Sequence, residues 1–222
     1  MHSPRICTVI TSGDLADLKR VEPLSELFEL RMDLVGDSWQ EIVSQIHKPW
    51  IATMRDISHR GKFAGSEEQR VNELMRAIEL GAGMVDIELD CPSLKDTVKR
   101  IKGSAGCLIS YHNWDETPPP EQLSIIVKQQ LAAGADICKV VTIAGDIEDN
   151  LVVLELPGRF PGIDVISFAM GPAGALSRVL SPLAGGYLTY ASMDKTGGSA
   201  PGQLSVEFLR RIYGTMARDD GL

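Results

Sequence analysis

Apolar and polar positions along the chain fall into two alternating patterns. Short runs rich in Ile, Val, Leu and Thr are almost continuously apolar, and longer stretches with apolar residues at helical spacing separate them. Unbroken apolarity is typical of parallel strands whose outer face is covered by helices. The expected strands lie at residues 5–11, 27–33, 50–55, 84–89, 107–112, 137–142, 164–170 and 186–191.

Three of the longer stretches carry clear helix signals. Residues 67–80 lie between Ser66, a good N-cap, and Gly81, a good helix stop. Residues 121–133 follow three consecutive prolines and end at Gly134, and a last helix is expected at residues 203–217. The side chains expected to face inward are Val71, Leu74, Met75 and Ile78, then Leu123, Ile126, Val127 and Leu131, then Leu204, Phe208, Leu209 and Ile212.

A strand followed by a helix recurs about eight times, roughly every 25 residues, which predicts a (β/α)8 barrel. No linker-like stretch interrupts the repeat, so we expect one domain over residues 1–222. The alternative is an open doubly wound sheet of the flavodoxin or Rossmann kind. The absence of a G-x-G-x-x-G fingerprint weakens that alternative.

Composition excludes several classes of protein. The net charge is −8 and no basic stretch is present, which argues against nucleic-acid binding. The four cysteines form no C-x-x-C pair, so we expect reduced thiols in a cytoplasmic protein and no zinc site. No apolar run reaches the ~18 residues of a membrane span, so we expect no membrane association.

In a (β/α)8 barrel, functional groups gather at the carboxyl ends of the strands. Among the polar residues there, Lys139 stands alone within the apolar run ICKVVT. Desolvation would disfavour the ammonium form and free the amine to attack a carbonyl. The structural alternative is a buried ion pair with Glu88 or Glu29, and the sequence does not decide between the two.

His112 ends the preceding strand, in the segment LISYHNW. An imidazole is well suited to proton transfer near neutral pH, although a histidine there can also merely cap the strand. Since the two strands are neighbours, we expect His112 and Lys139 at similar heights, close enough to act on one substrate.

Further charged groups follow other strands. Glu29 and Arg31 are two residues apart and therefore point to the same side, Arg55 ends the third strand, and Arg178 follows the seventh. An arginine can bind a carboxylate with two parallel hydrogen bonds, although each of these arginines can also be a surface residue. The glycine-rich segment at residues 195–205 predicts a loop that moves and binds a ligand through its polar groups, or a phosphate site at the start of the last helix. Its hydrogen-bonding side chains are Ser199 and Gln203.

The motifs ELRMD, TMRD, SYHNW, CKVV, MGPAGALSR and GGSAPGQ occur in the order found in type I 3-dehydroquinate dehydratases. The chain resembles that family from Arg5 to about Tyr213. The resemblance implies a barrel, a homodimer, and dehydration of 3-dehydroquinate in the shikimate pathway without metal or organic cofactor. It also implies that Lys139 forms an imine with the substrate and that His112 transfers protons. The implied substrate-binding residues are Glu29, Arg31, Arg55, Arg178, Ser199 and Gln203, and the implied pocket walls are Phe168 and Tyr190.

One segment departs from the family pattern. Bacterial members often carry a glutamate a few residues after the arginine that matches Arg55, whereas His59 or Arg60 stands there in this chain. If a carboxylate orients His112, Glu88 is the candidate by position. Two other functions remain open at this point: another Schiff-base barrel such as an aldolase or transaldolase, and a catalytically silent barrel that acts as a scaffold.

Overall fold

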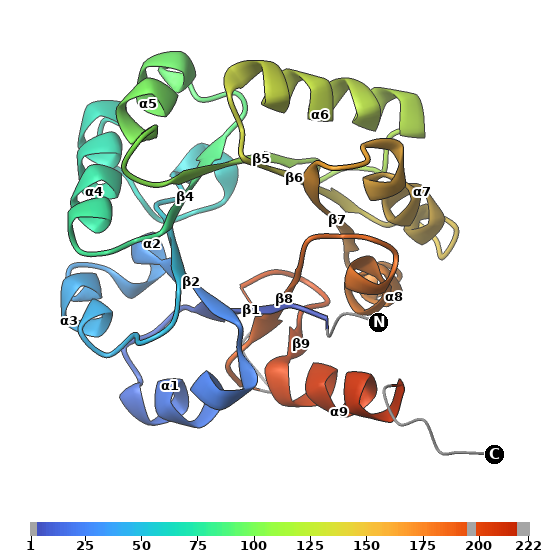
Figure 1. The fold of residues 1–222 in the computed structure, drawn as a ribbon, viewed down its shortest axis with the longest axis horizontal. Coiled ribbons are helices and arrows are strands. Elements are labelled where there is room, and N and C mark those ends of the chain that lie inside the picture. Colours follow the sequence, from blue (N-terminus) through green and yellow to red (C-terminus); the bar gives the residue numbers. More distant parts are fainter. Residues whose placement is uncertain (1–3, 195–198, 217–222) are drawn as a thin grey trace.

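The expected strands form a barrel in the computed structural model, which describes residues 4–194 and 199–216. All strand pairs are parallel, and the sheet runs in the order β7-β6-β5-β4-β3-β2-β1-β8-β9. The ring closes where the Tyr187 N–H donates a 2.8 Å hydrogen bond to the Val165 carbonyl of β7. Figure 1 looks down the ring and shows the helices surrounding it. The chain is therefore a (β/α)8 barrel, as the repeat predicts.

The strand bounds agree with the sequence pattern to within a few residues. The main strands are β1 (Ile6–Ile10), β2 (Leu27–Arg31), β3 (Trp50–Thr53), β4 (Met84–Glu88), β5 (Gly106–His112), β6 (Ile137–Ile143), β7 (Asp164–Met170) and β8 (Thr189–Ser192). A short extra strand, β9 (Leu204–Ser205), pairs with β8 and was not expected. Its residues were assigned to the last helix, because their hydrophobic pattern is compatible with both.

The helices lie outside the strands. They are α1 (Leu15–Val21), α2 (Met32–Val35), α3 (Trp39–Val43), α4 (Glu67–Glu79), α5 (Leu94–Ile101), α6 (Pro120–Ala133), α7 (Asp149–Glu155), α8 (Ala175–Leu180) and α9 (Val206–Met216). Short 3-10 turns are η1 (Glu22–Leu24), η2 (Ile57–His59), η3 (Pro157–Arg159) and η4 (Ser181–Leu183). None of the helices in the described part of the chain is long and apolar enough to cross a membrane.

The predicted start of α4 and the predicted end of α6 are confirmed by their capping contacts. Ser66 accepts a hydrogen bond from the Gln69 N–H, and the Gln69 side chain accepts one from the Ser66 N–H. Gly134 ends α6 in the left-handed conformation at φ 100°, which glycine adopts without steric cost. Phe208 was expected to face inward but is 44% exposed, because Val206, Leu209 and Tyr213 form the buried face of α9.

Alternation along the strands divides each one between the barrel interior and the helix layer. On β2, Phe28 and Leu30 pack toward the helices, whereas Leu27 lies in the interior cluster with side chains from the other strands. Toward the carboxyl ends the inward positions become polar, as at Glu29, Asp86 and Lys139. The interior of the barrel is thus filled by apolar side chains toward the amino ends of the strands, and the charged groups are concentrated toward the carboxyl ends.

Candidate active site

The inward side chains at the carboxyl ends of the strands line an open pocket. Its position agrees with the rule that barrel enzymes bind ligands at this end. The residues that line it are Val9, Glu29, Arg31, Arg55, His59, Arg60, His112, Trp114, Lys139, Val141, Phe168, Met170, Arg178, Tyr190, Ser199, Ala200 and Gln203.

Lys139 lies at the buried floor of this pocket, on β6. Its Nζ donates to Asp86 Oδ2 at 2.9 Å and to Glu29 Oε1 at 3.3 Å, and it lies 4.3 Å from the centre of the Tyr190 ring. Opposite charges and an aromatic face offset the desolvation cost of burying an ammonium group. The buried ion pair considered from the sequence is therefore present, with Glu29 as one partner and Asp86 in place of Glu88.

Asp86 begins a buried series of alternating charges that leads away from the pocket. Arg55 donates to Asp86 at 2.9 Å and to Glu88 at 2.7 Å. Glu88 also accepts from Arg70 of α4 at 2.8 Å, and Arg70 binds Glu67. Burial alone would raise the pKa of Asp86, but the neighbouring cations outweigh it and hold that pKa well below its usual range. Each of these carboxylates is therefore already engaged by an arginine.

His112 lies above Lys139 rather than beside it. The register pairs Ser110 with Lys139 and His112 with Val141, so His112 lies one inward-facing step further toward the carboxyl end, and both side chains line the same pocket. Burial, Arg55 and Lys139 all lower the pKa of His112 well below its usual value. The imidazole is consequently neutral near pH 7, the form that accepts a proton.

Glu88 does not orient this imidazole, contrary to the sequence-based suggestion. Its two oxygens accept hydrogen bonds from Arg55 and Arg70. Within the described residues no side chain or backbone group forms a hydrogen bond with the His112 ring, which instead stacks on Trp114.

Arg178 of α8 differs from the other buried arginines of the site. No carboxylate pairs with it in the part of the chain that the structure describes, where its Nη2 donates only to the Pro201 carbonyl at 3.2 Å and its Nε has no partner. Burial lowers its pKa to about 10, so the guanidinium is still charged at neutral pH. A buried cation without a protein anion favours an anionic ligand.

The remaining predicted residues lie at the rim. Arg31 donates two hydrogen bonds to Asp33 at 2.9 and 2.8 Å, and not to Glu29. The Ser199 N–H and hydroxyl both donate to Gln203 Oε1, at 2.6 and 3.0 Å. The first part of the predicted mobile loop, residues 195–198, lies outside the described residues.

Among residues 4–194 and 199–216, no group of three or more His, Cys, Asp or Glu is arranged to hold a metal ion. The four cysteines are buried and unpaired. Burial raises the pKa of the Cys7, Cys107 and Cys138 thiols, which leaves them protonated and weakly nucleophilic.

A family model described as type I 3-dehydroquinase matches residues 6–220. The chain belongs to the type I 3-dehydroquinase family. A 3-dehydroquinate dehydratase from Dehalococcoides mccartyi is 41% identical over 213 residues, which cover 96% of both chains. The corresponding protein of Methanocaldococcus jannaschii is 36% identical over 197 residues, covering 87% of this chain and 88% of the relative.

Solved structures of type I 3-dehydroquinases share the fold. The enzyme from Clostridium difficile superposes with a TM-score of 0.83 at 22% identity, over 97% of this chain and 93% of that one. The enzyme from Geobacillus kaustophilus superposes with a TM-score of 0.79 at 28% identity, over 98% and 93%. These dehydratases are hydro-lyases, and we assign this chain to the same enzyme class.

All of the predicted site residues of this dehydroquinase line the pocket described above. The sequence did not single out Asp86, Arg60 and Trp114, which also shape the site. A signal for Asp86 existed, since it stands two residues before Glu88 and so shares its inward face. Trp114 and Arg60 lie in loops, where spacing gives no direction for a side chain.

Asp86 should be essential to the stability of the barrel. In Asp86→Asn the charge that compensates Lys139 and Arg55 is lost, so we expect the free energy of unfolding to fall by about 3–5 kcal/mol in urea denaturation. The exposed Asp37→Asn is the matched control and should change it by less than about 0.5 kcal/mol. Equal stability of the two variants would contradict the charge balance described above.

Proposed function

We propose that this dehydroquinase dehydrates 3-dehydroquinate to 3-dehydroshikimate in the shikimate pathway, through a Schiff base at Lys139. The observation that carries the proposal is the pairing of two unlike groups in one pocket. Lys139 offers an amine to a ketone, and Arg178 offers hydrogen-bond donors that no described carboxylate occupies.

The substrate's carboxylate binds Arg178, and the segment with Ser199 and Gln203 closes the same side of the pocket. Glu29, Arg31 and Arg55 contact the ring hydroxyls from the opposite strands. This arrangement brings the ring ketone down toward Lys139, since the amine lies at the floor and the arginine lies on α8 above β7.

The ion pair at Lys139 is compatible with imine formation. The amine attacks the ketone carbon after losing a proton, and water leaves to give a protonated imine. Ammonium and protonated imine carry the same charge at the same place, so Asp86 and Glu29 stabilise both. The two interpretations of Lys139 left open by the sequence are thus two states of one residue.

His112 then moves the protons. It removes a proton from the carbon next to the imine, and the electron pair flows into the imine. When the electrons return, the ring hydroxyl departs with the proton that His112 donates, and water hydrolyses the imine to release the product. The neutral imidazole described above is the form that the first of these steps needs.

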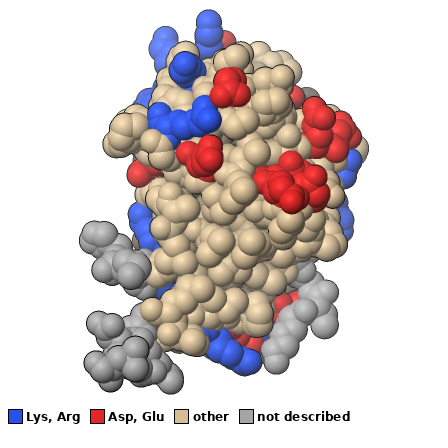
Figure 2. All heavy atoms as spheres, turned by 90° about the vertical axis from the view of Figure 1, so that its right-hand side faces the viewer, with Lys and Arg blue, Asp and Glu red and all other residues tan. Residues whose placement is uncertain are grey.

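We further propose that the chain works as one cytoplasmic domain and as a homodimer, with the contact on the face formed by α7 and α8. The exposed apolar side chains there are Ile147, Leu151, Leu176 and Leu183, between 40 and 62% accessible. Figure 2 shows that the middle of this side of the molecule, at the right of Figure 1, carries few charged side chains. A large uncharged patch of this kind favours a protein partner.

Borohydride trapping tests the Schiff base. Wild-type protein incubated with 3-dehydroquinate and borohydride should gain one ligand mass on the peptide that contains Lys139. His112→Ala should still be trapped while losing roughly 10²–10⁴-fold in turnover, because the amine remains and the base is gone. Lys139→Ala should give no adduct. An adduct on Lys62 or Lys195 would refute the assignment.

The carboxylate clamp is tested by steady-state kinetics. Arg178→Ala should raise KM about 10- to 100-fold and change kcat less, since the lost charge-assisted hydrogen bonds are made in both ground and transition states. Arg159→Ala, on the surface, is the matched control and should behave as wild type. A normal KM in Arg178→Ala would mean that another group binds the carboxylate.

A further inference from the structure

The orientation of His112 rests on ring contacts. Its imidazole lies 5.7 Å from the Trp114 ring, centre to centre, with the two planes only 13° apart. This is an offset-stacked geometry. Since no hydrogen bond to the imidazole is found in the described part of the chain, Trp114 is the contact that restrains its ring plane.

Trp114 is in turn held by Arg60. The guanidinium carbon of Arg60 lies 4.4 Å from the centre of the Trp114 ring, within the range of a cation–π interaction. Arg60 is exposed and comes from the loop after β3. His112 is the last residue of β5, and Trp114 lies in the loop that follows β5. The three side chains form a series of contacts, here called the stacked series, that joins two loops.

The backbone at Arg60 is unusual. It adopts φ 60° and ψ 25°, a left-handed conformation rare for residues with a side chain. Such a conformation persists only where the surroundings impose it, and it is concentrated at functional sites. Its position beside the pocket therefore points to a role beyond closing a turn.

The loop has the contacts needed to impose it. The Gly61 N–H donates to the Asp56 carbonyl at 2.7 Å, and the Arg60 N–H donates to the Ile57 carbonyl at 3.1 Å. A side chain at Gly61 would lie 2.0 Å from the Arg55 carbonyl oxygen, so the turn closes tightly.

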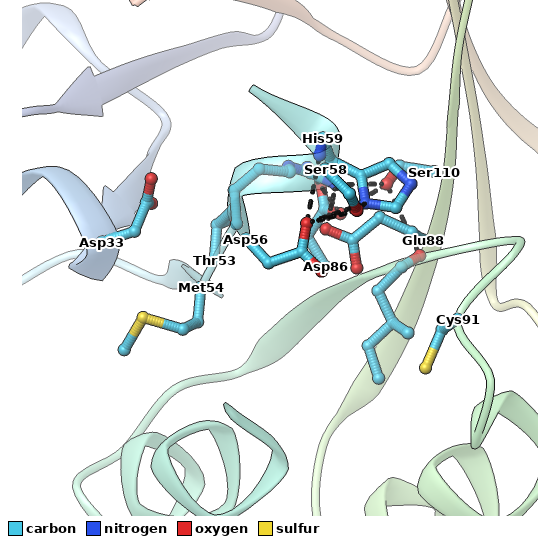
Figure 3. Close-up of polar contacts among 12 residues, drawn as sticks. Asp33, Thr53, Met54, Asp56, Ser58, His59, Asp86, Glu88, Cys91 and Ser110 are labelled. Atoms are coloured by element: carbon cyan, nitrogen blue, oxygen red, sulfur yellow. Dashed lines mark hydrogen bonds and ion pairs between the residues drawn. The ribbon is translucent and has the colours of Figure 1, made fainter. Parts of the chain in front are cut away.

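His59 fastens this loop to the next one. Its Nδ1 lies 3.1 Å from Asp56 and its Nε2 lies 2.9 Å from Asp90, which follows β4. Figure 3 shows His59, Ser58 and Asp56 together, next to the Asp86 and Glu88 side chains of β4. Burial would lower the pKa of His59, but its hydrogen bonds to Asp90 and Asp56 outweigh burial and raise it. The contacts of His59 with Asp56 and Asp90 therefore tie the loop that carries Arg60 to the loop after β4.

We propose that Arg60 and Trp114 are positioning residues that fix the ring of His112 for proton transfer. The inference rests on the proposed role of His112 in the dehydration. Stacking restrains the ring plane and leaves both imidazole nitrogens free, whereas a carboxylate bound to one nitrogen would favour the charged form. The charged groups that face His112 are Arg31 from β2, Arg55 from the end of β3, Asp86 from β4 and Lys139 from β6. Three of these four are cations, and the stacked series orients the base without adding an anion to them.

Two pairs of variants test the stacked series. Trp114→Leu removes the aromatic ring, and we expect kcat to fall about 100-fold, the cost of a base displaced by about 1 Å. Trp114→Phe keeps a smaller ring and should recover most of the rate. Arg60→Asn tolerates the left-handed backbone but lacks the cation, and should lose about fivefold in kcat, whereas Arg60→Lys should recover part of it.

The readouts separate positioning from other roles. KM and borohydride trapping with 3-dehydroquinate at Lys139 should stay near wild type in all four variants, because the amine and Arg178 are unchanged. The acid limb of the kcat pH profile should move in Trp114→Leu, since the imidazole loses its fixed surroundings. Arg76→Asn, an exposed arginine of α4, is the control for net charge and should match wild type.

The outcomes are distinguishable. If wild-type protein neither turns over nor traps 3-dehydroquinate, the proposed function fails. If wild type is active but Trp114→Leu and Arg60→Asn keep full kcat, the positioning role alone is wrong. A raised KM with normal kcat in Arg60→Asn would make Arg60 a direct substrate contact and overturn the proposal. Where Trp114→Leu fails to fold, the exposed Arg60 variants decide the question.

Discussion

Burying an amine inside the barrel is the constraint on which the rest of the site depends. An unpaired ammonium group in a protein interior costs several kcal/mol, so carboxylates must be buried with it. Asp86 and Glu29 meet that need at Lys139. Asp86 in turn needs Arg55, and Arg55 needs Glu88, so the compensation spreads across β2, β3 and β4 to α4.

The same charge compensation determines which groups of the pocket remain unpaired and can bind a substrate. The buried carboxylates of this network are all engaged by cations, so none is left to bind His112, whose imidazole stays neutral among Arg55 and Lys139. Arg178 lies on the far side of the barrel from the network and has no carboxylate of its own among the described residues. Under the proposed function, a ligand that supplies a carboxylate completes the charge balance of the pocket, and its carbonyl meets Lys139.

Much of this could be predicted from the sequence, because two-residue alternation assigns a side to each strand position. Glu29, Arg31, Arg55, His112 and Lys139 were placed at one barrel end because they fall at the carboxyl ends of the expected strands, and they line one pocket. Alternation does not give the stagger between neighbouring strands. That is why the similar heights expected for His112 and Lys139 hold only to within one inward-facing step, and why Glu88 was considered as a partner where Asp86 is found.

Contacts that depend on loops or on long side chains could not be predicted from the sequence. Arg70 was not among the residues expected to face inward on its helix, yet it is 2% exposed because it reaches Glu88 across the layer between α4 and β4. Trp114 and Arg60 come from separate loops, and only the folded chain shows that they meet. The sequence did mark the region, since the departure from the family pattern falls at His59 and Arg60.

The central claim is that burial, together with the surrounding cations, keeps His112 neutral and ready to accept a proton. The most direct test is an NMR titration of the histidine ring signals in the unliganded protein, with the His112→Ala variant used to assign the signal. His112 should titrate well below the ordinary value of 6.5, whereas His59, held between Asp56 and Asp90, should titrate above it. A His112 signal that titrates at or above 6.5 would contradict the account.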